Sequence, residues 1–327
     1  MLKIASHVLR VVMAMALFCA FVVWARTRSP EKMEVAAAPR VPAAGEAPLE
    51  KAALQWGGED WGWDWDKPVH DEQTVHKTFT VAAANGHREI EVDNVWGSIE
   101  VSGADGDTVQ MDVDESYHAE SEKTLERAKK EYVLNVSQDS GSLKAEAKYP
   151  DTCESATCWH AQDYPYAVEM NFKLQVPRDS DLTLKTVNGH EVRVRDVNGT
   201  FSIHNVNGEI MMDGISGSGT ARSVNGPIKV AFGKNPSGDS SFGTVNGSVT
   251  LRFPKNLSAD FQFRTFSGSI DSDFAVLANS AVPQESRHGT AFYFRTNALG
   301  GWRVGAGGPV VRVENLNGDI HILENHE

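Results

Sequence analysis

Apolar and polar residues alternate along most of the chain from residue 75 onward. Val75, Phe79 and Val81 fall on one face, and the segment from Val168 to Val176 alternates five times before Pro177. A period of two places successive side chains on opposite faces of an extended backbone. These segments therefore predict half-buried β-strands.

Two other local patterns complete the first half of the chain. The segments Val133–Ser137 and Leu143–Ala147 flank the turn residues Asp139-Ser140-Gly141, which predicts a β-hairpin. The segment Glu122–Glu131 has helical spacing of its apolar residues and follows Ser121, a good N-cap. We predict one short, charged surface helix there.

In the second half, a short unit repeats. Nineteen of the 28 glycines lie between Asp181 and Glu327, and six of these follow asparagine. The glycines recur first every 9 or 10 residues and then every 21. The repeated pairs, each preceded by valine or leucine, are Asn188-Gly189, Asn198-Gly199, Asn207-Gly208, Asn225-Gly226, Asn246-Gly247 and Asn317-Gly318.

Each glycine is followed by apolar residues at the second and fourth positions, as in Ile210/Met212 and Val249/Leu251. This spacing predicts a short strand with one inward face, and Asn-Gly allows a sharp turn before it. The turns could make hairpins or the corners of a coil. We favour a coil, because strands of four or five residues make poor independent hairpins, whereas stacked coils bury a continuous core. Asparagines at equivalent corners would then hydrogen-bond from coil to coil.

The Val-Asn-Gly units resemble those of the bacterial putative-adhesin domains of unknown function, which are toastrack-like β-solenoids. The resemblance extends from Val75 to Ile322 and includes the order of strands, short helix and Asn-Gly series. It implies an all-β fold: a single-stranded β-solenoid over residues 179–327, with a mixed N-terminal cap over residues 73–178 that contains the helix. It also implies an extracytoplasmic protein with no established activity, so the family supplies no catalytic residues.

The N-terminal 32 residues look like a targeting segment. Lys3, His7 and Arg10 form a basic head, and the fifteen residues from Val11 to Ala25 carry no charge. This length fits a signal-peptide core and is short for a membrane-spanning helix, so both a cleaved signal peptide and a retained signal anchor stay open. Either one predicts export, to the periplasm, the cell surface or the outer side of the inner membrane, and an anchor would add membrane association.

Residues 33–72 form an Ala/Pro/Glu-rich linker followed by a Trp/Asp-rich strip. The strip contains Trp56, Trp61, Trp63 and Trp65 among acidic residues. Exposed tryptophan rings usually contact something, so the strip either binds a sugar or protein partner or folds back to cap the following domain.

Cys153 and Cys158 are expected to form a local disulfide, because exported proteins commonly oxidise nearby cysteines. With His160 they could instead supply three metal ligands, but the spacing offers no fourth, so we expect no metal and no cofactor.

Charge narrows the choice of partner. The whole chain carries a net −13, and residues 1–32 carry +4, which leaves −17 on the remainder. This balance argues against nucleic acid. It leaves an envelope glycan or protein as the expected partner.

Enzyme, crystal-surface and sensor functions are the alternatives. A polysaccharide-acting β-helix enzyme needs clustered carboxylates, but the outward positions Glu209, Asp271 and Asp319 lie far apart in the repeat series, and Asp196 with Asp213 lacks a third partner. Binding to ice or a crystal surface would need Thr or Ser at the same outward positions of every coil, and Glu209/Met211 and Pro227/Lys229 interrupt such an array. A retained anchor would instead favour an envelope sensor or regulator. The sequence thus favours a non-catalytic binding, adhesion or structural module.

Overall fold

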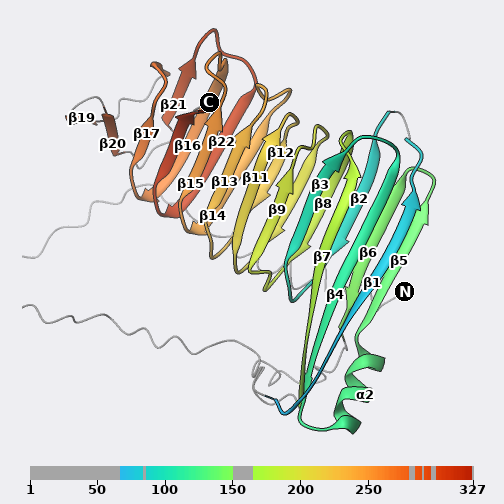
Figure 1. The fold of residues 1–327 in the computed structure, drawn as a ribbon. Helices are drawn as coiled ribbons and strands as arrows, with labels where there is room; N and C mark the ends of the chain where they lie inside the picture. Colours follow the sequence, from blue (N-terminus) through green and yellow to red (C-terminus); the bar gives the residue numbers. More distant parts are fainter. Residues whose placement is uncertain are drawn as a thin grey trace, which may run out of the picture. The chain divides into compact units, whose positions relative to one another are not determined.

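The computed structural model describes residues 67–83, 86–149, 165–279, 284–288, 291–295 and 300–325. Within them the chain forms two large sheets and a separate hairpin of β19 (Gln284–His288) and β20 (Ala291–Arg295). Figure 1 shows the strands of the two large sheets stacked beside one another, long at the end that holds β1, β4 and β7 and short in the repeat region.

Sheet A has ten strands in the described part. Their order is β1 (Val69–Thr80), β4 (Thr108–Ala119), β7 (Tyr166–Pro177), β3 (Ile99–Ala104), β9 (Glu191–Arg195), β11 (Glu209–Ile215), β13 (Ile228–Phe232), β15 (Val249–Phe253), β23 (Ile320–Glu324) and β17 (Ile270–Ser272).

Sheet B has eleven strands among the same residues. Their order is β18 (Val276–Asn279), β21 (Gly300–Val304), β16 (Ala259–Ser267), β22 (Val310–Asn317), β14 (Ser240–Asn246), β12 (Gly219–Arg222), β10 (Phe201–Asn205), β8 (Ser180–Thr186), β2 (Arg88–Asp93), β6 (Ser142–Lys148) and β5 (Val133–Asp139).

The repeat region is a coil, as the sequence predicts. Each unit runs along sheet B, turns at an Asn-Gly corner, runs along sheet A and returns to sheet B at an opposite corner. Strands of successive units pair in parallel: β8 with β10, β10 with β12 and β12 with β14 in sheet B, and β9 with β11, β11 with β13 and β13 with β15 in sheet A. Over residues 187–253, which are all described, no antiparallel hairpin forms.

The core lies between the two sheets. Inward positions such as Ile203, Ile210 and Val249 are fully buried. Rings from the two sheets meet there, since Phe232 of β13 packs edge-on against Phe242 of β14 with centroids 6.1 Å apart. The alternation of apolar residues therefore has the expected cause, which is one buried face per strand.

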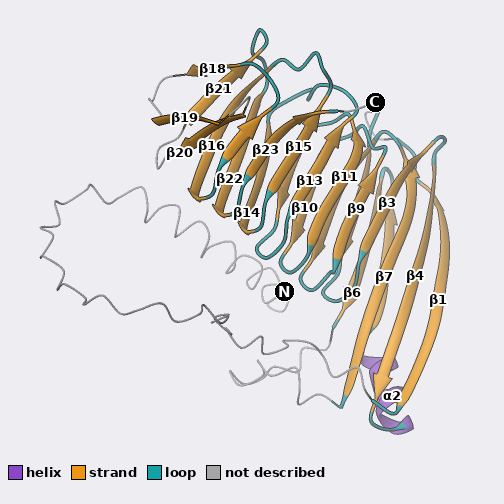
Figure 2. Ribbon diagram, turned by 60° about the vertical axis from the view of Figure 1, so that its left-hand side comes forward, coloured by secondary structure: helices purple, strands orange, loops and turns teal. Residues whose placement is uncertain are grey.

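Both ends of the stack depart from chain order. The C-terminal coil, β22 with β23, lies between the coil of β14 and β15 and the coil of β16 and β17. At the other end, the first coil, β2 with β3, lies between β6 and β7 on one side and β8 and β9 on the other. Figure 2 shows β23 beside β15 at one end and β3 beside β9 at the other. A spacing of 50 residues between Gly268 and Gly318 therefore separates two adjacent coils.

The N-terminal cap also matches its prediction. The helix α2 spans Glu122–Glu131, and the Ser121 hydroxyl accepts a hydrogen bond from the Thr124 N–H at 3.3 Å. The strands β5 and β6 form the antiparallel hairpin, and β7 ends at Pro177. Strand β1 begins at Val69, four residues before the expected domain boundary at 73.

Candidate functional site

The Asn-Gly corner carries a ladder of asparagine side chains. Each amide nitrogen Nδ2 donates to the Oδ1 of the asparagine one coil nearer the N-terminal end, at 2.7 to 3.0 Å. The ladder comprises Asn188, Asn207, Asn225, Asn246 and Asn317. Asn198 lies at the opposite corner, where its Nδ2 donates to Asp179 at 3.2 Å. The Asn-Gly pairs therefore mark two different corners, which the repeat pattern alone does not separate.

Glycine is required at these corners chiefly by close approach. A Cβ built on Gly226 would lie 2.0 Å from the carbonyl oxygen of Gly208, and one built on Gly318 would lie 2.1 Å from that of Gly247. Each corner glycine thus sits directly on the backbone of the neighbouring coil. Gly318 also has a φ of +138°, which disfavours any side chain.

A second polar row lies inside the Asn-Gly corner, two residues before each ladder asparagine. Its members are small polar residues that are mostly buried, and four of them are Asn205, Ser223, Thr244 and Asn315. Each donates to a corner glycine carbonyl of the neighbouring coil, at 2.9 to 3.1 Å. The sequence carries this signal in the tetrapeptide Thr/Asn/Ser-Val-Asn-Gly, whereas the tripeptide Val-Asn-Gly alone does not show it. At the opposite corner this position holds Asp196 or Gly214.

We predict that Gly226→Ala destabilises the fold, whereas Gly233→Ala is nearly neutral. The new methyl group at residue 226 would overlap a backbone oxygen, but the nearest atom to a Cβ at residue 233 is 3.5 Å away. We expect a loss of about 1–3 kcal/mol in the free energy of unfolding for the first variant, measured by urea denaturation. Equal stability of the two variants would contradict the close-approach argument.

The outward face of sheet A is occupied by charges that neutralise one another across strands. Arg195 Nη1 donates to Glu100 at 3.0 Å, and Lys229 Nζ lies 2.7 Å from Glu209. Arg193 pairs with Glu191 on the same strand. These partly exposed ion pairs contribute little to the free energy of folding, but they leave this face with a weak local electrostatic potential.

Acid and base groups do meet at the C-terminal end of sheet A. His321 Nδ1 lies 2.6 Å from Asp271 Oδ1, and Asp319 Oδ1 accepts from both the N–H and the hydroxyl of Ser269 at 2.7 Å. The expectation that Asp271 and Asp319 lie far apart is wrong, because the inserted C-terminal coil places β23 directly beside β17. Since the Ser269 hydroxyl is bonded to Asp319 and the His321 ring to Asp271, the cluster fastens two coils and shows no Ser–His nucleophile–base pair.

The His321–Asp271 pair makes stability depend on pH. Its hydrogen bond to Asp271 raises the pKa of His321 above its usual value. A raised pKa in the folded state means that the stabilisation is complete below about pH 6.5, the value of free histidine, and is lost as the pH rises through the folded-state pKa. The difference in melting temperature between the wild type and His321→Gln should therefore shrink from pH 5.5 to pH 8.5. Asp271→Asn should show the same trend, and a constant difference would contradict it.

The outward face of sheet B is organised in three rows over consecutive coils. A hydroxyl row comprises Thr183, Ser202, Thr220 and Ser241, which lie in register on β8, β10, β12 and β14. Beside it runs a basic row of Lys185, His204 and Arg222, and then an apolar row of Val187, Val206, Val224, Val245, Leu316 and Phe266. A regular hydroxyl row thus exists on sheet B, whereas Glu209 and Lys229 interrupt the outward positions of sheet A.

The pKa of His204, in the middle of the basic row, is lowered to about 4 by burial first and by the charges of Arg222 and Lys185 in addition. Lys185 is itself paired with Glu91 at 3.2 Å. His204 is therefore neutral at physiological pH, and its Nε2 lies 3.3 Å from the Ser202 hydroxyl. The outward positions of β10, β12 and β14 carry no carboxylate, which distinguishes this area from sheet A.

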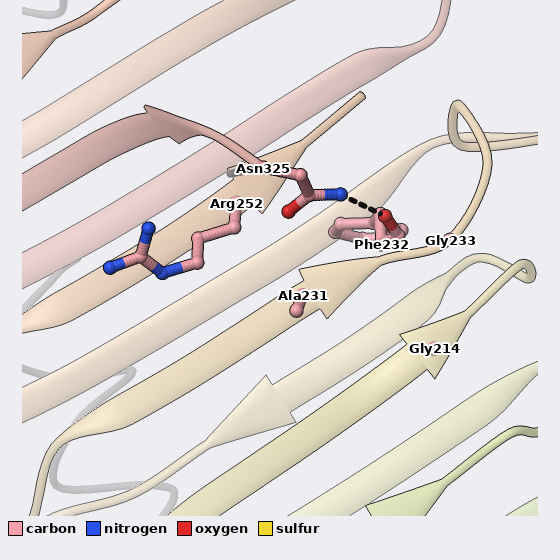
Figure 3. Close-up of a pocket in the computed structure, with 6 residues that line it drawn as sticks. All are labelled: Gly214, Ala231, Phe232, Gly233, Arg252 and Asn325. Atoms are coloured by element: carbon pink, nitrogen blue, oxygen red, sulfur yellow. Dashed lines mark hydrogen bonds between the residues drawn. The ribbon is translucent and has the colours of Figure 1, made fainter. Parts of the chain in front are cut away.

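The described residues also form a shallow hollow at the opposite corner (Figure 3). It is lined by Gly214, Ala231, Phe232, Gly233, Arg252 and Asn325, and the Asn325 amide donates to the Phe232 carbonyl at 2.8 Å. The hollow contains no convergent acid, base or nucleophile, so it offers no chemistry of its own.

Other sequence-derived candidates lie outside the described residues. These are the targeting segment 1–32, the Trp strip (Trp56, Trp61, Trp63 and Trp65) and the cysteine pair Cys153 and Cys158 with His160. Among the residues that are described, no group of three or more His, Cys, Asp or Glu side chains could hold a metal ion. The same part of the chain contains no helix that is both long and apolar enough to cross a membrane.

Residues 171–323 match the family model of the Toastrack domain DUF4097. This part of the chain is a Toastrack domain. The match begins within β7 and ends within β23, so the Toastrack domain includes the Asn ladder, the three rows of sheet B and the inserted C-terminal coil.

Several solved structures are similar to the chain that carries this Toastrack domain. A putative cell adhesion protein from Clostridium sporogenes is 9% identical, with 77% of this chain and 100% of that chain covered and a TM-score of 0.34. A putative adhesin from Bacteroides fragilis is 10% identical, with coverage of 77% and 97% and a TM-score of 0.36. A putative lipid binding protein from Parabacteroides distasonis is 11% identical, with coverage of 76% and 96% and a TM-score of 0.24. No curated protein shows significant similarity to the chain.

Proposed function

We propose that this protein is an exported, non-catalytic binding module of the bacterial cell envelope, and that the outward face of sheet B is its binding face. The observation that carries the proposal is the three-row arrangement on β8, β10, β12 and β14. The hydroxyl and apolar rows repeat over all four coils at the strand spacing of about 4.8 Å, and the basic row occupies β8, β10 and β12. Such a face suits an extended ligand with a matching repeat.

The acid and base groups of the described residues support a binding role over catalysis. Arg195, Lys229 and His321 are held in pairs with carboxylates of neighbouring strands. Asp196 and Asp213 lie on adjacent coils and are joined by a backbone hydrogen bond, in which the Asp196 N–H donates to the Asp213 carbonyl at 2.9 Å. A hydrolase or lyase needs a carboxylate or base that is available to the substrate.

Three further proposals concern the N-terminal part. The apolar segment from Val11 to Ala25 directs export, and it supplies membrane association if it is retained. Trp56, Trp61, Trp63 and Trp65 form a second contact region for an envelope glycan or protein. N-terminal sequencing of the exported protein distinguishes a cleaved signal from a retained anchor, and retention would favour an envelope-sensing role.

The proposal is tested with the protein as recovered from an exporting host. Protease-treated cell-wall polysaccharide is incubated with this protein, and both co-sedimentation and the release of reducing ends are measured. We expect saturable binding without depolymerisation. Depolymerisation would overturn the non-catalytic assignment, and absence of binding would overturn the binding assignment. A deletion of residues 56–65, which leaves β1 intact, tests whether the Trp strip contributes.

A further inference from the structure

We propose that Asn188-Gly189 is a site of spontaneous deamidation, at which Asn188 is converted to aspartate or isoaspartate, and that the other Asn-Gly pairs of the Asn ladder are protected from this reaction. Asparagine followed by glycine is the dipeptide most prone to it, because glycine has no side chain to obstruct its backbone nitrogen. The chain has seven Asn-Gly pairs, and both residues are described in six of them: the five of the ladder and Asn198-Gly199. The hydrogen bonds at the corners distinguish these six.

The reaction joins the glycine nitrogen to the side chain of the asparagine before it. The Gly189 N–H gives its proton to water or hydroxide, and the nitrogen forms a bond to Cγ of Asn188. The Cγ–Nδ2 bond then breaks as Nδ2 takes a proton from water and leaves as ammonia, which leaves a succinimide ring. Water opens the ring at either carbonyl and yields aspartate or isoaspartate. The reaction is therefore favoured where the glycine N–H and the asparagine Nδ2 are both free of hydrogen bonds.

In the other four ladder pairs both groups are held. The Gly208 N–H donates to the Asn225 carbonyl at 2.8 Å, and the equivalent bonds of Gly226, Gly247 and Gly318 measure 2.9 to 3.0 Å. The Nδ2 of each preceding asparagine donates along the ladder at 2.7 to 3.0 Å. Two hydrogen bonds must therefore break before the glycine nitrogen can displace the side-chain amide.

Asn188 stands at the end of the ladder, where neither group is held. Its neighbour one coil nearer the N-terminal end is Trp96, which offers no amide oxygen in its side chain. Among the residues that the structure describes, the Asn188 Nδ2 and the Gly189 N–H have no hydrogen-bond partner. Asn207 still donates to the Asn188 Oδ1 at 2.7 Å, and this oxygen becomes negative when Cγ is attacked, so the bond assists the reaction.

One extra residue causes the difference at this corner. Val192 follows Asn188 by four positions, whereas its register partner Ile210 follows Asn207 by three. The additional residue is His190. Because of it, the corner of Asn188 is out of step with the corner of the next coil, although the strands that follow the two corners are in register.

The insertion leaves the backbone link between the first two ladder corners incomplete. The Asn207 N–H donates to the Val187 carbonyl at 2.8 Å. Gly208 returns a bond to the carbonyl of Asn225, which completes a bridge between those two coils. Within the described chain, Gly189 returns no such bond to Asn207, so its N–H keeps the freedom that the reaction needs.

Asn198-Gly199 at the opposite corner is intermediate. The Asn198 Nδ2 donates to Asp179 at 3.2 Å, but the Gly199 N–H has no hydrogen-bond partner in the described part of the chain. The expected order of rates is therefore Asn188, then Asn198, then the other ladder asparagines. Exposure alone predicts a different order, because Asn188 is half-buried and the other five asparagines are exposed.

The experiment follows deamidation of the full chain, as recovered from the exporting host, during incubation at mildly alkaline pH. Peptide mass spectrometry measures the extent at each asparagine, and the same chain unfolded in urea is the reference. In the folded chain we expect Asn188 to react at least about tenfold faster than Asn207, Asn225, Asn246 or Asn317. In urea we expect the six pairs to react at similar rates.

Two variants test the cause. Deletion of His190 removes the extra residue and should slow Asn188 to the rate of the other ladder asparagines. His190→Ala keeps the extra residue but removes the imidazole, and it should leave the rate at Asn188 unchanged. An equal fall in both variants would assign the reactivity to the imidazole and overturn the hydrogen-bond argument.

The wild type alone can overturn the proposal. Equal rates at Asn188 and Asn225 in the folded chain would do so, as would faster reaction at the exposed ladder asparagines. Reaction of Asn188 in urea but not in the folded chain would have the same meaning. If the deletion variant lacks a cooperative melting transition, the comparison of the folded wild type with the unfolded wild type decides.

Discussion

Val249→Asp should abolish folding of the Toastrack domain, whereas Thr250→Asp should leave it folded. Val249 is fully buried on β15, and its neighbours in register are Ile228 and Ile320, so a carboxylate there would have no polar partner. An unpaired buried charge costs several kcal/mol, which is comparable to the total stability of about 5–15 kcal/mol. The expected result is insoluble protein, or protein without a cooperative thermal transition.

The adjacent substitution is the control because it adds the same charge one residue further on. Thr250 points outward and lies in register with Lys229 and His321, so Thr250→Asp should change stability by no more than about 0.5 kcal/mol. If Val249→Asp melts like the wild type, the inward face of the sheet A strands is wrongly assigned. Ile210→Asp on β11 gives an independent repeat of the test.

Removal of the C-terminal coil should have an effect of similar size. A stop codon at Pro309 deletes β22 and β23, which are the parallel partners of β16 and β17 and one of the two parallel partners of β14 and β15. It also removes Val311, Val313, Ile320 and Ile322, which are fully buried and stabilise the fold by about 1.5–3 kcal/mol each. We expect loss of protection from hydrogen exchange over residues 240–272 and a large fall in melting temperature.

The matched truncation removes only residues 326 and 327 and should have no effect. The coil of β16 and β17 could in principle dock directly on β14 and β15 once the inserted coil is gone. A truncated chain that keeps protection over residues 259–272 would show that it does so, and would contradict the expected result.

Local structure was predictable from the sequence because local residues cause it. Alternation of apolar residues predicts β7 and the strands of the repeat, Ser121 predicts the start of α2, and Asp139-Ser140-Gly141 predicts the hairpin of β5 and β6. The parallel coil followed from strands too short to pair alone. These inferences needed only the periodicity of the backbone and the chemistry of turns.

Pairing order was not predictable from the sequence. Every coil has the same apolar pattern, so no local feature of the sequence predicts that β23 pairs with β15 and β17. The proposed binding face was not predicted for a related reason, since the positions after the ladder Asn-Gly pairs lie on sheet A and only those after Asn198-Gly199 lie on sheet B. The hydroxyl row lies on the strands of sheet B, between the opposite corner and the Asn-Gly corner of each coil. Only the coil geometry brings its four members into one row: Thr183, Ser202, Thr220 and Ser241.

The inserted coils have a consequence for how the chain acquires its structure. A simple solenoid can form progressively from its first repeat as the chain emerges from an export channel. Here residues 310–324 follow β16 and β17 in the chain but lie between them and the coil of β14 and β15, so β16 and β17 cannot take their final places until residues 310–324 are available. Residues 259–324 must therefore form in one late, long-range step, which makes them slower to fold than the central coils and exposed to aggregation until that step is complete.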